Sequence, residues 1–467
     1  MSRYGRCSSS CTSGRRRMPR ADSTICTTLV YDPGFLIDAW HRVAGNTGAK
    51  TAGIDGLTVA AIESGPGVQP FLMDIRDELK ARIYRPAPVR RTQIPKSNGK
   101  MRDLGIPTVK DRGVQAALKA VLESIFEADF LPVSYGFRPG RRAHDTIAEI
   151  VYLARRGYSV VLEADIEACF DNIDHVALMD RLRARISDKR VLGLVKAYLK
   201  AGVMHHGIAK DTPTGTPQGG ILSPLLANIA LTALDEHFHV RWHTRMGTSW
   251  QREKRRKIGT GNWRLVRYAD DFVFLVSGPA HRAEVSALCE QVAEVLAPLG
   301  PRLSPEKTRV VHIEDGFDFL GHHIRRQRKR DTNKLVVYTR PSKKAIKAVK
   351  DRVSERTYRH TQNQSLATLL EGLNRTMTGW ATYFRHGAAK RTFNAVDHHA
   401  WHRVAIWLRR KHGIPSSQLK GFCDQGWRFA DSGTVFLGAS SVMIERYRYR
   451  GARIPTPWTI EPAANNG

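Results

Sequence analysis

The stretch WRLVRYADDFVFLV, residues 263–276, holds two adjacent carboxylates, Asp270 and Asp271, between two apolar runs. The runs are rich in β-branched and aromatic residues, so the stretch predicts a buried strand, a turn and a second strand. Another such run, at residues 158–165, also predicts a buried strand, and it ends in Asp165. An ionised carboxylate at the end of a buried strand is costly unless a cation pairs with it. The three aspartates are therefore the first candidates for chemistry.

The aspartates have no obvious basic partner in the sequence, and a divalent metal ion is the simplest explanation for them. Carboxylate oxygens are hard ligands, which suit magnesium. Two magnesium ions about 4 Å apart can activate a hydroxyl group and stabilise a departing pyrophosphate, as nucleotide polymerisation requires. The alternative for the Asp270-Asp271 pair is a plain turn, because Asp favours turns for its own hydrogen bonds. The surrounding sequence decides between the two.

The chain is strongly basic, with 74 Lys+Arg against 44 Asp+Glu and a formal net charge of +30 over 467 residues. Such a charge predicts a polyanionic partner, either nucleic acid or an anionic membrane surface. No stretch of the sequence approaches the roughly 20 apolar residues that span a bilayer, and the basic residues are spread along the whole chain. Nucleic acid is therefore the expected partner, and no membrane is expected.

Helical periodicity dominates much of the first half of the chain. Helices are expected over residues 31–91 and 112–199, interrupted by the strand at 158–165. A tight hairpin is expected at residues 94–100, because Asn98-Gly99 favours the turn between two short extended runs. Together with the later strand-turn-strand, this pattern predicts an α+β fold.

The second half contains two basic stretches and then a helical region. We interpret residues 250–257 as a solvated loop or nucleic-acid contact, and residues 322–330 as the end of another hairpin. From residue 342 onward, apolar residues recur at spacings of three and four, which places them on single helix faces that pack into a core. The two stripes are Ile346, Val349 and Val353, followed by Leu366, Leu369, Leu373, Met377, Trp380 and Phe384.

The residues around the aspartates resemble the catalytic motifs of reverse transcriptases. Tyr268-Ala269-Asp270-Asp271 is similar to the catalytic box of that family, and Asp165 with Ile166 and Phe170 resembles its upstream partner motif. The resemblance implies that the three aspartates are catalytic and that they and Ile166 bind two Mg²⁺ ions, with Mn²⁺ as a substitute. In the family an aromatic residue at the position of Phe170 acts as a gate against the ribose 2′-hydroxyl. Deoxynucleoside triphosphates are therefore the expected substrates.

Further blocks narrow the resemblance to the reverse transcriptases encoded in group II introns. They occur in the order of that family and extend the resemblance from about residue 35 to residue 420. The blocks are IPK at 94–96, RDLGIP at 102–107, SYGFRPGR at 134–141, TPQGGILSPL at 216–225, EKT at 306–308 and GFDFLG at 316–321. Asp103 and His322 depart from the usual family residues, and neither belongs to the catalytic set.

The resemblance implies a right-hand polymerase of α+β fold followed by a helical maturase region. We expect a basic, disordered arm at residues 1–30, fingers at 31–160, a palm with an antiparallel sheet at 161–340 and a thumb and maturase region at 341–420. Residues 421–467 are expected to form a basic tail without an endonuclease domain. A role for this tail in binding the DNA target rests on its charge alone.

Four residues are candidates for contact with the incoming nucleotide. Lys96 and Arg102 lie on or beside the predicted hairpin, where their counterparts in the family clamp the triphosphate, and Lys100 is a reserve candidate. Phe170 is the sugar gate. Gln218 lies in the PQGG segment, where glycine lets the backbone approach a base pair closely. The alternatives are ordinary surface charge for the basic residues and a plain loop for Gln218.

The region LNR at 373–375, GWATYF at 379–384 and WLRRKH at 407–412 resembles the maturase domain, which binds intron RNA in the family. RNA of this kind is recognised through shape, backbone charge and stacking, for which basic helices with aromatic residues are suited. The RNA and template contacts implied are Arg138, Arg141, Lys307, Arg375, Arg409 and Arg410. Arg138 and Arg141 have a second interpretation, in which they stabilise the fold instead.

The implied function is that of an RNA-directed DNA polymerase which also promotes splicing of its intron and supports intron mobility by target-primed reverse transcription. Its implied partners are group II intron RNA, an RNA template with a DNA primer, and a DNA target site. One alternative is another bacterial reverse transcriptase, of the retron or diversity-generating type. A second is a splicing-only RNA-binding maturase, against which the retention of all three aspartates argues.

Two further features leave alternatives open. The cysteines at 7, 11, 26, 169, 289 and 423 lack the spacing of a zinc site, and His398 and His402 lack a suitable third ligand, so we expect no metal at either set. The scattered cysteines also favour a reducing, bacterial cytoplasm.

The first twenty residues are rich in Arg and Ser and contain no acid. We interpret them as a basic arm or as sequence upstream of a true start at Met18, and an organellar targeting peptide is the competing interpretation.

Overall fold

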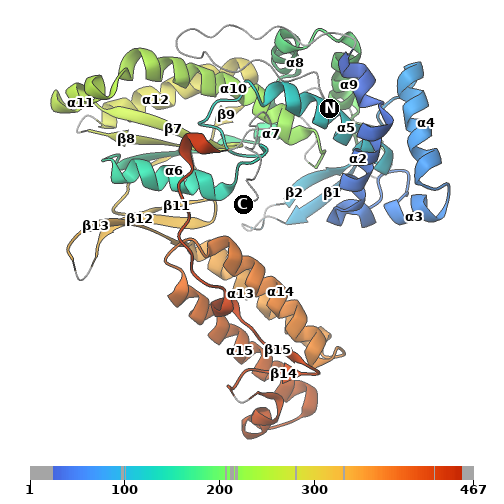
Figure 1. The fold of residues 1–467 in the computed structure, drawn as a ribbon, viewed down its shortest axis with the longest axis vertical. Helices are drawn as coiled ribbons and strands as arrows, with labels where there is room; N and C mark the ends of the chain where they lie inside the picture. Colours follow the sequence, from blue (N-terminus) through green and yellow to red (C-terminus); the bar gives the residue numbers. More distant parts are fainter. Residues whose placement is uncertain are drawn as a thin grey trace, which may run out of the picture. The chain divides into compact units, whose positions relative to one another are not determined.

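The computed structural model describes residues 25–95, 99, 101–205, 208–210, 215, 219–278, 281–329, 332–424 and 426–454. Figure 1 shows the helices and strands coloured along the sequence. The chain divides into two compact units, each built from separate stretches. The first unit comprises Met1–Phe130, Ala168–Thr232 and Leu296–Arg302. The second comprises Leu131–Glu167, Ala233–Val295 and Leu303–Gly467.

The first unit combines helices with a small mixed sheet. Its helices are α1 (Ile25–Val30), α2 (Pro33–Ala44), α3 (Val59–Ser64), α4 (Val68–Ala81), α5 (Val109–Phe126), α7 (Cys169–Asn172), α8 (His175–Arg185), α9 (Lys189–Lys200) and the start of α10 (Ser223–Arg241). Its strands, in the order in which they pair, are β2 (Met101–Ile106), β1 (Val89–Pro95), β5 (Val203–His205) and β6 (Ile208–Lys210). The antiparallel pairing of β1 with β2 confirms the hairpin predicted from Asn98-Gly99.

Helix α1 corrects one prediction. Residues 1–30 were expected to form a disordered arm, but Cys26 and Val30 are buried and the Thr27 hydroxyl donates to Asp188 Oδ2 at 2.5 Å. Two apolar residues four positions apart lie on one helix face, and that face packs into the core of the unit. Residues 1–24, which include Cys7 and Cys11, lie outside the described residues.

The second unit contains the sheet that carries the candidate aspartates. The sheet is antiparallel throughout, with the strand order β10 (Arg309–His312), β3 (Val160–Ala164), β8 (Asp271–Ser277) and β7 (Asn262–Tyr268). Strands β3, β7 and β8 confirm the two predicted strand regions. Ile147 and Ile150 of helix α6 (Ala143–Arg155) share a core with the apolar residues of this sheet, so α6 packs directly against it.

The remaining elements of this unit surround that sheet or follow it. They are β4 (Ile166–Glu167), α11 (Ser249–Lys257), α12 (His281–Leu296), β9 (Arg302–Leu303), β11 (Phe317–Phe319), β12 (His322–Arg328), β13 (Leu335–Pro341), α13 (Lys343–Arg356), α14 (Leu366–Phe384), α15 (Lys390–His412), β14 (Ala430–Asp431) and β15 (Thr434–Val435). Strands β11, β12 and β13 form a separate antiparallel sheet in that order, and β14 pairs with β15.

Helix α11 corrects a second prediction. The basic run at 250–257 favours a solvated loop or a nucleic-acid contact; Ser249–Lys257 form a helix, which overturns the loop and leaves the nucleic-acid contact a prediction. Thr248 and Gln251 make a capping box, in which each side chain bonds to the backbone of the other residue. This satisfies N–H groups at the helix start that would otherwise lack partners. The sequence did not predict this helix because the basic run has no apolar stripe.

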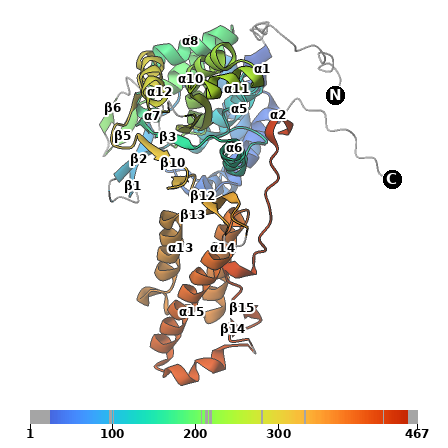
Figure 2. The ribbon, with the colours of Figure 1, turned by 90° about the vertical axis from the view of Figure 1, so that its left-hand side faces the viewer.

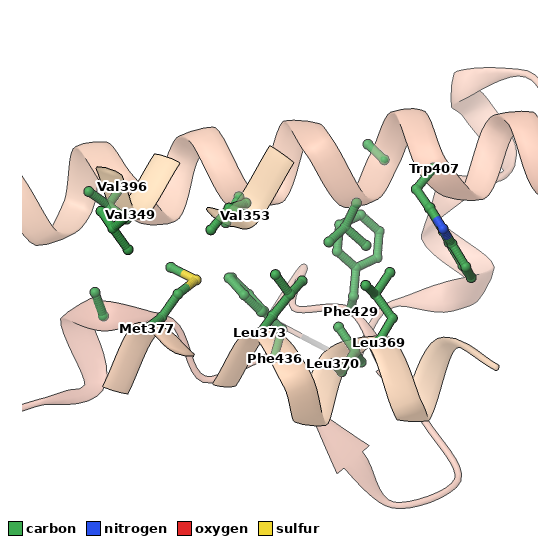
Figure 3. Packing of buried hydrophobic residues seen from close by; sticks show 14 of the residues in the cluster. Val349, Val353, Leu369, Leu370, Leu373, Met377, Val396, Trp407, Phe429 and Phe436 are labelled. Carbon is green, nitrogen blue, oxygen red and sulfur yellow. The ribbon is translucent and has the colours of Figure 1, made fainter. Parts of the chain in front are cut away.

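Helices α13, α14 and α15 form a bundle whose core confirms the predicted stripes (Figures 2 and 3). Val349 and Val353 of α13 face Leu369, Leu373 and Met377 of α14, and all are buried. Val396 and Trp407 of α15 complete the core, together with Phe429 and Phe436 from the segment that follows. Among the described residues, no helix has both the length and the apolar character needed to cross a membrane.

Candidate functional site

Asp270 and Asp271 lie at the tight turn of the β7–β8 hairpin. Tyr268 pairs with Asp271, so Ala269 and Asp270 alone make the turn. Ala269 has a φ of 57°, a left-handed conformation that costs a residue with a side chain roughly 1–2 kcal/mol. Gly136 packs closely against this turn. A Cβ at Gly136 would lie 2.4 Å from the Ala269 nitrogen, so only glycine permits that approach.

Asp165 lies beside this hairpin because β3 pairs with β8. The register of the two strands ends with Ala164 opposite Phe272, so the next residue of each strand is Asp165 and Asp271. Lys307 Nζ donates to Asp165 Oδ2 at 2.6 Å, and the Ser304 amide donates to the Asp165 carbonyl at 2.9 Å. The antiparallel register therefore brings two strand ends and three carboxylates to one end of the sheet.

A buried ion pair behind the hairpin fixes its turn, and sequence reasoning missed it. Arg267 of β7 and Asp235 of α10 are both 0% exposed. Arg267 Nε donates to Asp235 Oδ1 at 2.8 Å, and its Nη2 donates to Asp235 Oδ2. The third nitrogen, Nη1, donates to the Ala269 carbonyl at 2.8 Å, which ties the turn directly to the pair. The available signal was that Arg267 and Asp235 each stand within a largely apolar segment.

The carboxylates perturb one another. Asp271 is exposed as a residue, but the protein shields its carboxyl group from water. This shielding raises the pKa of Asp271 to about 6, and the charges of Asp270 and Asp165 add to the shift. Lys307 opposes this shift with its positive charge. The hydrogen bond to Asp165 in turn raises the pKa of Lys307. A site that raises the pKa of one of its carboxyl groups in this way favours a further cation.

The carboxylates open onto a cavity of about 360 Å³ lined by Asp165, Asp271, Lys307, Arg309 and Asp318, among others. Ile166 is buried with an apolar side chain, so only its backbone oxygen could act as a ligand. Within the described part of the chain, no three His, Cys, Asp or Glu side chains are grouped closely enough to hold a metal ion. Asp165, Asp270 and Asp271 therefore form at most part of a metal-ligand set in this structure.

Comparison with known proteins identifies the family. The family described as "Reverse transcriptase (RNA-dependent DNA polymerase)" matches residues 94–324, and the family "Group II intron, maturase-specific domain" matches residues 346–422. Protein YkfC of Escherichia coli (strain K12) is 39% identical over 335 residues, which cover 68% of this chain and 87% of YkfC. The chain belongs to the group II intron-encoded reverse transcriptases. Its first family match makes it an RNA-directed DNA polymerase, a class that generally uses divalent metal ions.

Two more distant matches complete the comparison. The group II intron-encoded protein LtrA of Lactococcus lactis subsp. cremoris is 34% identical over 350 residues, which cover 63% of this chain and 56% of LtrA. This reverse transcriptase therefore spans little more than half the length of LtrA. A solved structure of telomerase from Candida albicans aligns with a TM-score of 0.40 and 13% identity over 74% of this chain and 66% of that one.

The residues expected at the incoming nucleotide belong to the first unit. Phe170 is half-buried in α7, and Arg102 is exposed on β2. Lys96, Lys100 and Gln218 lie outside the described residues. Next to Gln218, Gly219 has a φ of 112°, and a Cβ there would lie 2.5 Å from the Gly105 carbonyl oxygen, so this glycine permits a close approach within the protein itself.

Of the residues expected to touch RNA or template, Lys307 is bonded to Asp165, and the other five fall into two groups. Arg138 is buried and donates to the carbonyl oxygens of Leu131 and Ser134 at 2.7 Å each, contacts that support the fold-stabilising interpretation. Arg141 likewise donates to the Pro132 carbonyl at 3.2 Å. In the maturase-specific domain, by contrast, the candidates Arg375, Arg409 and Arg410 are all exposed.

Proposed function

We propose that this reverse transcriptase extends a DNA primer on an RNA template at the sheet end formed by Asp165, Asp270 and Asp271. The observation that carries the proposal is the antiparallel register, which sets Asp165 next to Asp271 at the hairpin turn. In this proposal residues 31–160 serve as fingers, 161–340 as palm and 341–420 as thumb and maturase region. Arg102 and Phe170 contact the deoxynucleotide, together with Lys96 and Gln218.

The donor set fits Mg²⁺, held by the aspartates and the backbone oxygen of Ile166. When bound, two such ions supply Lewis acidity for the primer 3′-hydroxyl and charge neutralisation for the leaving pyrophosphate. The chain itself positions these ligands. Arg267 holds the turn through the Ala269 carbonyl, and Lys307 orients the Asp165 carboxylate. Lys307 also keeps a positive charge beside the site, where a nucleotide phosphate would be stabilised.

The proposal is tested by primer extension on an RNA template after chelation of divalent ions. We expect extension to return with Mg²⁺ and deoxynucleotides, to return with Mn²⁺ as a substitute, and not to return with ribonucleotides. Tight RNA binding without any extension would instead support the splicing-only maturase. Extension only on one dedicated RNA encoded beside the gene would support the retron type.

We expect cation affinity to depend on pH through Asp271. Because the pKa of this carboxyl is raised to about 6, Asp271 is ionised at pH 7.5 and takes up a proton as the pH falls through 6. A protonated carboxyl cannot bind a cation, so the apparent affinity for Mg²⁺ should fall by about tenfold per pH unit below 6. Mg²⁺ titrations of thermal stability between pH 5 and 7.5 measure this. In Asp271→Asn the dependence near pH 6 should disappear, and a wild-type affinity constant across this range would contradict the assignment.

We propose further that the bundle binds RNA through a basic hollow on α13 and α14. Arg352 and Arg356 of α13 and Arg375 of α14 line an open hollow of about 800 Å³. Trp380 lines it too, and its indole N–H is buried without a hydrogen-bond partner among the described residues. Three arginines against the single acid Glu355 leave the lining net positive, which suits the phosphate groups of an RNA backbone.

Arg375→Gln should weaken RNA binding several-fold at moderate salt and reduce the slope of log affinity against log salt by about one ion. The measurement is a salt series of RNA titrations. The control is Lys347→Gln, which removes one charge from the same bundle at a residue paired with Asp351 at 2.6 Å and absent from the hollow. Equal losses in both variants would show that overall charge, and not the hollow, determines affinity.

A further inference from the structure

The segment that follows the bundle runs back along helix α6 (Figures 1 and 2). We name residues 443–454 the C-terminal strap. Before it, Phe436 and Ala439 are buried in the bundle core, and Asp397 of α15 accepts from the Ser440 amide at 2.9 Å. At its far end, Ile454 is buried in the core that α6 shares with the catalytic sheet. The strap is thus anchored in two separate hydrophobic cores.

The middle of the strap is bound to the first turn of α6 by Asp145. Arg450 Nε donates to Asp145 Oδ1 at 2.8 Å and Arg450 Nη2 donates to Asp145 Oδ2 at 2.5 Å. The Tyr447 hydroxyl donates to the same carboxylate at 2.9 Å. Burial acts to raise the pKa of Asp145, but the hydrogen bonds from Arg450 and its other donors hold that pKa below its usual value. Asp145 is therefore the charged centre of this contact.

A second contact lies further along α6. The ring of Tyr449 stacks on Tyr152 with centroids 4.4 Å apart and planes 13° apart. The Tyr449 hydroxyl donates to Glu149 Oε2 at 2.5 Å. Stacked aromatic pairs contribute beyond the area that they bury, and a bidentate Arg–carboxylate pair fixes geometry as well as distance. The two contacts therefore fix the orientation of the strap on α6, whereas charge attraction alone would not.

At its start the strap holds the end of α14. Glu445 forms an ion pair with Arg385, and its amide donates to the Arg385 carbonyl at 3.1 Å. The end of α14 also reaches α6 directly, because His144 Nε2 lies 2.7 Å from the Tyr383 carbonyl oxygen. The strap therefore bridges the base of the bundle and the helix that packs on the catalytic sheet.

We propose that Tyr449 and Arg450 are positioning residues, through which the strap fixes the bundle against α6 and so keeps the growing duplex engaged during DNA synthesis. This inference rests on the proposed polymerase function. The bundle follows the sheet through the β13–α13 junction, and bonds of Tyr383 to His144 and to Leu320 also hold the end of α14. The strap adds a further attachment at α6, which restricts the bundle in advance and lowers the entropic loss on binding a duplex. Part of the tail's positive charge is thereby used inside the protein and not on a DNA target.

The test compares Tyr449→Ala/Arg450→Ala with the matched control Arg446→Ala/Arg448→Ala, whose arginines are exposed on the same strap. With an excess of competitor duplex to limit synthesis to one binding event, we expect the first variant to give products several-fold shorter than wild type. Its rate of adding a single nucleotide should stay unchanged, and the control should match wild type in both. Hydrogen exchange should become faster at the start of α6 and the end of α14 in the first variant only.

Unchanged product length in the first variant would overturn the proposal, as would an equal loss of single-nucleotide addition. A larger effect in the control would also overturn it, and would assign the tail to DNA contact. If the wild type makes no DNA, the proposed function falls, and hydrogen exchange still decides whether the strap holds the bundle to α6. No change in exchange would then overturn the strap as well.

Discussion

Asp165→Asn and Asp270→Ala are each expected to reduce DNA synthesis by at least about a thousandfold, because metal-ion stabilisation of a transition state contributes several kcal/mol and each 1.4 kcal/mol is tenfold in rate. Each variant removes a carboxylate from the end of the sheet where β3 meets the β7–β8 turn. The rate of single-nucleotide addition at saturating primer-template is the measurement, since it separates chemistry from binding.

The matched control for these variants is Asp318→Asn. Asp318 lines the same cavity, but it lies on β11 and its carboxylate bonds to His323 Nδ1 at 2.7 Å. Its loss should leave the rate within a few-fold of wild type. Asp270→Ala should unfold at no lower temperature than wild type, because it relieves repulsion with the Asp271 carboxylate, whereas Asp165→Asn also loses the ion pair with Lys307. Retained synthesis in Asp270→Ala, or a loss in Asp318→Asn as large, would contradict the proposed site.

The parts of the fold that the sequence predicted are those whose signal is local. The hairpin at 263–276 follows from two apolar runs around a polar pair, and the bundle follows from stripes such as Leu369, Leu373 and Met377. Both depend only on residues within a few positions of one another. Helix α11 was missed because its stabilising feature is a capping box at Thr248 and Gln251 and not an apolar face.

Long-range contacts could not be predicted in the same way. Arg450 and Asp145 are separated by 305 positions, and nothing in the basic sequence of the tail distinguishes Arg450 from Arg446 or Arg448. Which arginine meets a carboxylate depends on where the chain returns, and that is a property of the whole fold. The candidate site shows both cases, because the aspartates were found from their strands whereas Arg267 and Asp235 required the packing of α10 on β7.

Arg267→Met is expected to lower the free energy of unfolding by about 3–5 kcal/mol, the usual cost of removing one partner of a buried ion pair. Methionine preserves much of the arginine's volume, so the loss comes from leaving Asp235 ionised, buried and without its guanidinium. Asp235 is 0% exposed, so water cannot replace the missing donors. Urea unfolding of the second unit's sheet and helices, followed by circular dichroism, measures the change.

The double variant Arg267→Met/Asp235→Leu separates stability from turn geometry. Replacing both partners with apolar side chains removes the buried charge, so most of the lost stability should return. DNA synthesis should not recover, because the double variant still lacks the hydrogen bond from Arg267 to the Ala269 carbonyl that holds the Asp270 turn. If synthesis recovers together with stability, the pair serves only to stabilise the fold. If Arg267→Met lowers the free energy of unfolding by less than about 1 kcal/mol, the ion pair does not contribute to stability as its burial predicts.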